Sequence, residues 1–165
     1  MTAKDIAKAI RHKKNNARQY VIAEEVNITT GFASRRLDVV ILDCFESHGF
    51  EIEGIEIKIS RADLMRELKM PEKHEEFYQH LDLYTLAAPE WLIKQEKDKM
   101  PKEWGLLAVS EEGKATYIRK PKRLHESLSQ VDRGFFASFV RAATNQARGE
   151  AWHSAKEDID NYLIL

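Results

Sequence analysis

A glutamate and a lysine stand two positions apart in the stretch from Ile55 to Ser60, with an isoleucine between them and one on either side. In a β-strand, residues i and i+2 project from the same face. Glu56 and Lys58 are therefore expected to point together, while the three isoleucines pack on the opposite face. An acid beside a base on such a strand indicates a site for a charged group. The tripeptide alone is weak evidence, because it also occurs on solvated edge strands.

A second carboxylate, Asp38, directly precedes Val39–Leu42, an apolar run typical of a strand buried on both faces. Residues 46–49 predict a hairpin turn into the strand that carries Glu56. Asp38 then has two interpretations: a turn residue at a strand start, or a metal ligand. Paired strands bring opposed side chains to about 4.5–5.5 Å at Cβ, where two carboxylates can share one cation. Oxygen ligands without histidine or cysteine favour Mg²⁺ or Mn²⁺.

The segment 19–28 alternates apolar and polar residues like a strand and carries two neighbouring acids. Glu24 is in phase with the apolar positions, where a carboxylate is costly unless it is paired. Glu25 is easier to place on a polar or active-site face.

Helices and further strands must position these residues. The pattern predicts a helix over 2–18, one or two helices over 61–82 that begin at the N-cap Ser60, and a helical tail from about Gly134. Short apolar segments at 84–88 and 105–109 predict strands, and the turn at 111–113 leads into 114–119. The apolar end of the chain, 162–165, is expected to dock on the body or on another subunit.

Two segments are locally basic although the chain of 165 residues has a net charge of -1. A solvated helix face and a phosphate-facing surface are both compatible with the first segment, which spans 2–18. The second spans 114–123 and contains no acid. The basic residues of the two segments are Lys4, Lys8, Arg11, Lys13, Lys14, Arg18, Lys114, Arg119, Lys120, Lys122 and Arg123.

Composition excludes several classes of protein. Cys44 is the sole cysteine, so neither an intramolecular disulfide nor a cysteine-rich zinc site is possible. The string 74–78 starts like a zinc-protease motif, but Tyr78 stands where the second histidine is required. No apolar run approaches the ~20 residues that span a membrane, and the start lacks the apolar region of a signal peptide. A cytoplasmic location is the expectation.

Six segments of the chain form an ordered set of motifs: 35–40 (RRLDVV), 56–64 (EIKISRADL), 81–89 (LDLYTLAAP), 104–107 (WGLL), 117–119 (YIR) and 141–143 (RAA). This set resembles the PD-(D/E)XK nuclease superfamily and, within it, the MmcB-like DNA repair group. The proline that names the superfamily is absent, because Leu37 precedes Asp38.

The resemblance implies a restriction-endonuclease-like α/β fold with a central mixed sheet of four to five strands flanked by helices. One domain would span 1–165, with its core at about 19–125 and a C-terminal helical extension at about 134–165. It implies Asp38 and Glu56 as ligands of Mg²⁺ or Mn²⁺, assisted by the backbone carbonyl of Ile57. Lys58 would position the attacking water or steady charge on the phosphate, and Glu25 would complete the catalytic set.

The implied function is metal-dependent hydrolysis of DNA in repair, recombination or phage DNA processing. The alternative is an inactive DNA-binding accessory protein of a repair complex. The helical tail is expected to mediate a homodimer or contact a repair-complex partner, and no membrane is expected as a partner. The residues expected to contact DNA are Arg35, Arg36, Lys73, Tyr78, Lys120 and Lys122.

Overall fold

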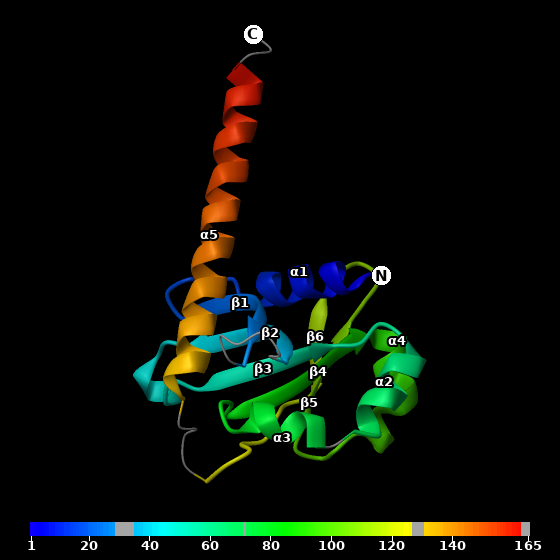
Figure 1. Ribbon diagram of the computed structural model, residues 1–165. Helices are drawn as coiled ribbons and strands as arrows, with labels where there is room; N and C mark the ends of the chain where they lie inside the picture. The colour runs from blue at the N-terminus through cyan, green and yellow to red at the C-terminus, as the bar shows by residue number, and fades with distance from the viewer. Residues whose placement is uncertain (29–34, 71, 127–130, 163–165) are drawn as a thin grey trace.

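Six strands form one mixed sheet in the order β1-β2-β3-β4-β5-β6 in a computed structural model (Figure 1). The structure describes residues 1–28, 35–70, 72–126 and 131–162; the side chains of 72–73 and 151–162 lie outside that description. The sheet exceeds the expected four to five strands because both outer segments pair with it. The strands are β1 (Tyr20–Asn27), β2 (Arg36–Asp43), β3 (Ile52–Ile57), β4 (Leu83–Pro89), β5 (Gly105–Val109) and β6 (Ala115–Arg119).

Helices cover both faces of the sheet, which confirms the α/β class (Figure 1). One face packs against α1 (Ala3–Lys13), which ends at Lys13 rather than at the predicted residue 18. The other face and its apolar core pack against four helices. They are α2 (Arg61–Leu68), α3 (Glu72–Tyr78), α4 (Glu90–Glu96) and α5 (Arg133–Tyr162), and short 3-10 helices lie at Glu46–His48 and Lys97–Lys99.

Strand direction determines which residues meet at each end of the sheet. β1, β2 and β3 are antiparallel neighbours, β3, β4 and β5 are parallel, and β6 returns antiparallel to β5. The carboxyl ends of the three parallel strands therefore lie at one end of the sheet. Because β2 runs the opposite way, its first residues lie at that same end. This topology brings Asp38 of β2 to the end of β3, where Glu56 lies.

The apolar face of β3 forms largely as expected. Ile55 and Ile57 are buried in the core beneath α1. The sequence pattern predicts Ile59 beside them, but β3 ends at Ile57 and the side chain of Ile59 is 42% exposed. The alternating pattern therefore fails at Ile59, two residues past the end of the strand.

β1 does not follow the single alternation predicted for it. Tyr20 and Ile22 pack in the core beneath α1, whereas Val26 and Ile28 pack in the core on the opposite face. The switch occurs at Glu25, whose φ of 55° lies in the left-handed region. A left-handed residue reverses the facing of the strand, and such a conformation costs about 1–2 kcal/mol for a residue with a Cβ.

The predicted helical tail is α5, a helix of 30 residues. Phe135 and Phe139 near its start are buried in the core opposite α1. At 1.5 Å per residue the helix is about 45 Å long, so its later turns extend well beyond the sheet (Figure 1). Across the described ranges no helix has both the length and the apolar character needed to cross a membrane. The predicted docking of 162–165 falls outside the described side chains.

Candidate active site

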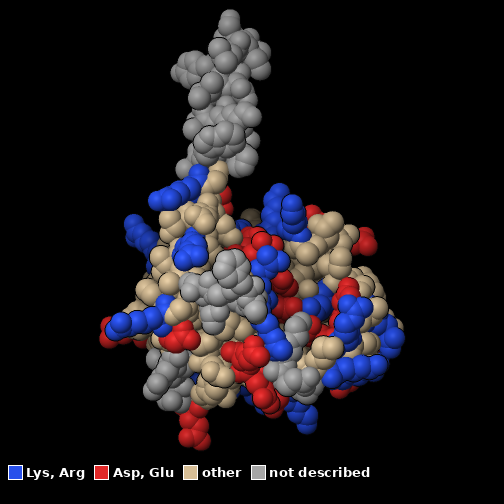
Figure 2. Space-filling view, in the orientation of Figure 1, with Lys and Arg blue, Asp and Glu red and all other residues tan. Residues whose placement is uncertain are grey.

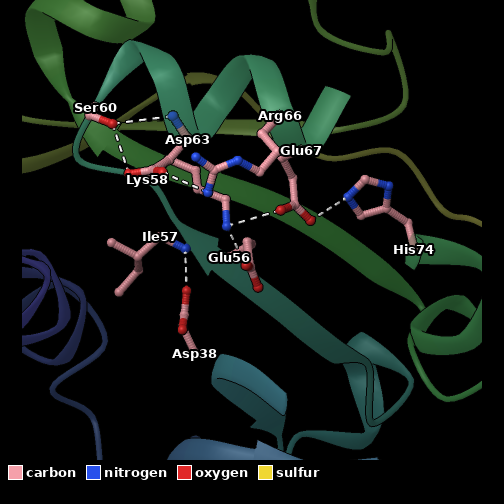
Figure 3. Close-up of polar contacts among 9 residues, drawn as sticks. All are labelled: Asp38, Glu56, Ile57, Lys58, Ser60, Asp63, Arg66, Glu67 and His74. Carbon is pink, nitrogen blue, oxygen red and sulfur yellow. Dashed lines mark hydrogen bonds and ion pairs between the residues drawn. The ribbon is translucent and has the colours of Figure 1, made fainter. Parts of the chain in front are cut away.

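Asp38 and Glu56 face each other across β2 and β3. Val39 pairs with Ile55, so the same antiparallel register places Asp38 opposite Glu56. The Ile57 backbone N–H donates a hydrogen bond to Asp38 Oδ2 at 2.7 Å, which fixes the aspartate against the end of β3 (Figure 3). Glu56 is buried, with 7% of its surface exposed. Asp38 is half-buried, and the two carboxylates lie close together as the strand pairing predicted.

Burial makes this pair of carboxylates electrostatically unfavourable. It raises the pKa of Asp38, although the Ile57 N–H and Lys58 oppose the rise. Burial also raises the pKa of Glu56, and the negative charge of Asp38 adds to that rise. Glu56 Oε2 is buried and accepts no hydrogen bond from the described part of the protein. An unpartnered oxygen beside a second acid is an arrangement that a divalent cation would stabilise.

Lys58 follows the end of β3 and bridges two carboxylates (Figure 3). Its Nζ lies 2.6 Å from Glu56 Oε1, which confirms that the two side chains point together, and 3.1 Å from Glu67 Oε2. Burial alone would lower the pKa of Lys58, but the charges of Glu56 and Glu67 raise it above the ordinary value. Lys58 is therefore a fixed positive charge at neutral pH. Such a group suits phosphate stabilisation better than proton abstraction.

Glu67 and His74 extend the site, and the sequence analysis did not identify either. Glu67 Oε1 lies 2.9 Å from His74 Nε2, and both side chains are buried. Ser60 caps α2 by accepting a hydrogen bond from the Asp63 N–H, which sets the phase of the helix. Leu64 then faces the core, and Glu67 follows one turn later on the same face. A carboxylate in phase with an inward leucine was the signal that could have identified Glu67.

A hollow of about 230 Å³ opens beside Lys58. It gives solvent and small groups access to the lysine from the side where β3 leads into α2. Charged and apolar side chains share its lining. The lining residues are Ala3, Ile57, Lys58, Ile59, Asp63, Arg66 and Glu67.

The predicted site for Mg²⁺ or Mn²⁺ can be compared with the oxygen atoms that the structure places near Asp38 and Glu56. Asp38 and Glu56 supply carboxylate oxygens, and Glu56 Oε2 lacks a partner among the described residues. Within the described ranges, no three Asp, Glu, His or Cys side chains form a metal-binding group. A cation here would therefore depend on two carboxylates, the predicted carbonyl of Ile57 and water, which is a common donor set for Mg²⁺.

The structure does not bring Glu25 into this group. Its register on β1 is level with Asp38, but the left-handed backbone leaves its side chain 69% exposed and 3.3 Å from Arg36 Nη1. Glu24 pairs instead with Arg11 and lies close to Gln146 of α5. Neither Glu24 nor Glu25 therefore joins Asp38 and Glu56, and Glu67 lies near Lys58 as a further acid.

The other residues predicted to contact DNA have different surroundings. Arg36 is exposed beside Glu25, and Arg35 lies 3.4 Å from Glu76 at the surface. Tyr78 is half-buried, and its hydroxyl accepts a hydrogen bond from Trp104 Nε1 at 2.6 Å. Lys73 belongs to α3, and its side chain lies outside the described part. Both arginines lie close to Asp38 in sequence, and of the two Arg36 is the exposed one.

The two basic segments meet at the opposite end of the sheet. Lys120 follows β6, whose last residue lies beside the start of β5. It lines a hollow of about 330 Å³ together with Lys14, whose ammonium lies 6.0 Å from the centroid of the Tyr117 ring. Lys122 is exposed nearby in sequence. On the face shown in Figure 2, lysines and arginines are interspersed with acids rather than gathered into one field.

No family model and no curated protein matches the chain. Among solved structures, the chain is similar to SPO1766, a protein of unknown function from Silicibacter pomeroyi. The TM-score is 0.65 at 20% sequence identity, and the similarity covers 96% of this chain and 94% of that chain. At this identity the similarity extends to the fold alone. Function has to be argued from the site.

Proposed function

We propose that this protein is a metal-dependent nuclease that hydrolyses DNA phosphodiester bonds. One observation carries the proposal. Asp38, Glu56 and Lys58 converge at one end of the sheet, and Glu56 Oε2 is buried there with no hydrogen-bond partner among the described residues. A buried and a half-buried acid, both with raised pKa values, are costly to keep together beside a protonated lysine. Perturbed groups of this kind are more typical of a functional site than of a structural one, and a hollow opens beside Lys58.

The chemistry follows from the charges. A bound Mg²⁺ or Mn²⁺ would neutralise phosphate charge and supply an activated water. Asp38 and Glu56 would hold the ion, and the Ile57 N–H keeps the Asp38 carboxylate in place. Lys58 would contribute a fixed positive charge to the phosphate, because the neighbouring acids keep it protonated. Arg36 is exposed at the end of the sheet where Asp38 lies, and it is the arginine best placed to contact the DNA backbone.

The proposal includes the restriction-endonuclease-like fold and the resemblance to the MmcB-like group. A mixed sheet with helices on both faces is compatible with that fold. DNA repair, recombination or phage DNA processing in the cytoplasm is the setting we propose. A homodimer through α5 is also part of the proposal, because its later turns extend beyond the sheet (Figure 1).

The test is a cleavage assay on duplex, single-stranded and branched DNA with Mg²⁺ or Mn²⁺. The wild type is expected to cut at least one substrate, and Lys58→Ala and Asp38→Ala are expected to lose that activity. Glu53→Gln is the matched control, because Glu53 is a buried acid of the same strand on the other face. Equal behaviour of the wild type and both site variants on every substrate would refute the nuclease proposal.

The second candidate is an inactive DNA-binding accessory protein. It is favoured by the meeting of two basic segments around Tyr117, at the end of the sheet away from Asp38. Charge reversal by Lys120→Glu together with Lys122→Glu is then expected to weaken DNA binding and lower the salt slope by about 0.9 for each phosphate that the protein no longer neutralises. Binding measured by fluorescence anisotropy from low to high salt checks this. An unchanged slope would remove that surface from both candidates.

A further inference from the structure

Glu67 and His74 form a buried pair behind Lys58. His74 Nε2 lies 2.9 Å from Glu67 Oε1, and Glu67 Oε2 lies 3.1 Å from Lys58 Nζ. The two oxygens of the Glu67 carboxylate thus contact different groups. Oε1 contacts the His74 imidazole, and Oε2 contacts the Lys58 ammonium. Glu67 is 5% exposed and His74 is 2% exposed, so water competes little with either contact.

The imidazole of His74 has a fixed orientation. Its ring centroid lies 4.8 Å from that of Trp104 and 5.5 Å from that of Tyr84, both at steep angles, and Tyr78 lies almost parallel to it at 6.2 Å. Rings on three sides leave the imidazole little freedom to rotate. A carboxylate hydrogen-bonded to such a ring is itself held in one orientation.

Lys58 is shared between two acids whose tasks differ. Glu56 lies 2.6 Å from the ammonium but also faces Asp38, with its other oxygen unpartnered in the described structure. If Glu56 engages a cation, its charge is drawn away from Lys58. The lysine then needs a second anion to keep it in place, and Glu67 is the acid at bonding distance.

We propose that Glu67, oriented by His74, is a positioning residue that holds the Lys58 ammonium and leaves Glu56 available for a divalent cation. This inference rests on the proposed function, because it assigns Glu56 to a cation. Loss of the Glu67 charge directs the whole ammonium charge at Glu56. Lys58 then competes with the cation for that carboxylate.

A double-mutant cycle on cation affinity tests the inference without relying on activity. Mn²⁺ binding is measured by calorimetry for the wild type, Glu67→Gln, Lys58→Ala and the double variant, and thermal unfolding confirms that each is folded. Glu67→Gln is expected to weaken Mn²⁺ binding about tenfold in the wild-type background and less than about twofold in the Lys58→Ala background. His74→Phe, which keeps an aromatic ring, is expected to reproduce part of the loss. Glu53→Gln is expected to leave Mn²⁺ affinity unchanged.

The outcomes separate the two proposals. Equal losses in both backgrounds would mean that Glu67 acts on the cation directly or through the fold, and would overturn the positioning role alone. No loss from Glu67→Gln in a protein that binds Mn²⁺ would also overturn only that role. A wild type that neither binds Mn²⁺ nor cuts DNA would overturn the proposed function and this inference with it.

Discussion

β3 carries two buried carboxylates, one on each face of the sheet, and they differ in how completely the protein supplies them with hydrogen-bond partners. Glu53 is satisfied: its Oε1 accepts hydrogen bonds from Thr85 Oγ1 and Tyr117 Oη, each at 2.6 Å, and its Oε2 lies 3.5 Å from Lys14 Nζ. Glu56 is as buried, with 7% exposed against 5%, yet it faces Asp38 and has an unpartnered oxygen in the described structure.

This difference teaches how to separate a structural acid from a functional one. Burial of a charge is costly in either case, and the network around Glu53 compensates that cost within the protein. The cost at Glu56 is compensated only in part, by Lys58. An acid that the fold leaves incompletely satisfied is a better candidate for an external ligand than one that the fold satisfies.

The largest expected effect is on activity. Glu56→Gln is expected to lower the DNA cleavage rate at saturating Mg²⁺ by about 10³-fold or more, because a lost metal ligand removes several kcal/mol of transition-state stabilisation. Glu53→Gln is expected to stay within about threefold of the wild type, since its partners lie on the other face. Equal losses in the two variants would contradict the comparison.

The same two substitutions are expected to rank in the reverse order when stability, rather than activity, is measured. Glu53→Gln is expected to lower the free energy of unfolding by about 1–2 kcal/mol, because it weakens hydrogen bonds to a charged acceptor. Glu56→Gln without divalent cations is expected to raise that free energy by about 1 kcal/mol, because one of two repelling acids is removed. Each kcal/mol corresponds to about 2–4 °C in thermal unfolding. A destabilised Glu56→Gln would show that its carboxylate is structural.

The dependence of the free energy of unfolding on pH tests whether Asp38 and Glu56 are unfavourably placed in the folded protein. Asp38 and Glu56 have raised pKa values in the folded protein, so the folded state holds their protons more tightly than the unfolded state does. The stability that these two groups contribute to the folded state is therefore fully present below the ordinary pKa values of 3.8 and 4.5. It is lost as the pH rises through the raised values.

Thermal unfolding between pH 4 and pH 7, in chelator, measures this loss. Relative to the double variant Asp38→Asn/Glu56→Gln, the wild type is expected to lose about 1 kcal/mol over that range. Mg²⁺ is expected to restore it by binding the folded state. A constant difference between the two proteins across this range would contradict the raised pKa values.

The smallest effect concerns Glu25. Its φ of 55° suits glycine, and its ion pair with Arg36 is exposed. Glu25→Gly is therefore expected to raise the free energy of unfolding by about 0.5–1 kcal/mol, measured by urea unfolding, with cleavage unchanged within about twofold. A fall in cleavage of about 100-fold with intact stability would restore Glu25 to the catalytic set.

Local patterns predicted much of the fold. The positions of the strands, the capped start of α2 at Ser60 and the helical tail all follow from short-range periodicity. The expected count of four to five strands is wrong because it rests on the resemblance rather than on the six strand-like segments of the chain. The single alternation over 19–28 is wrong because periodicity assumes an ordinary backbone, and Glu25 has a left-handed one.

The sequence by itself determined that Glu56 and Lys58 share a face and that Asp38 can lie opposite them, because strand geometry has a period of two and hairpin-linked strands pair. Tertiary structure decided everything that depends on the packing of separate elements. It placed Glu67 of α2 and His74 of α3 behind Lys58, and it brought Lys14 of the first basic segment and Lys120 of the second together at the far end of the sheet. Spacing along the chain specifies side-chain direction within one element, whereas distances between elements depend on how their apolar faces pack.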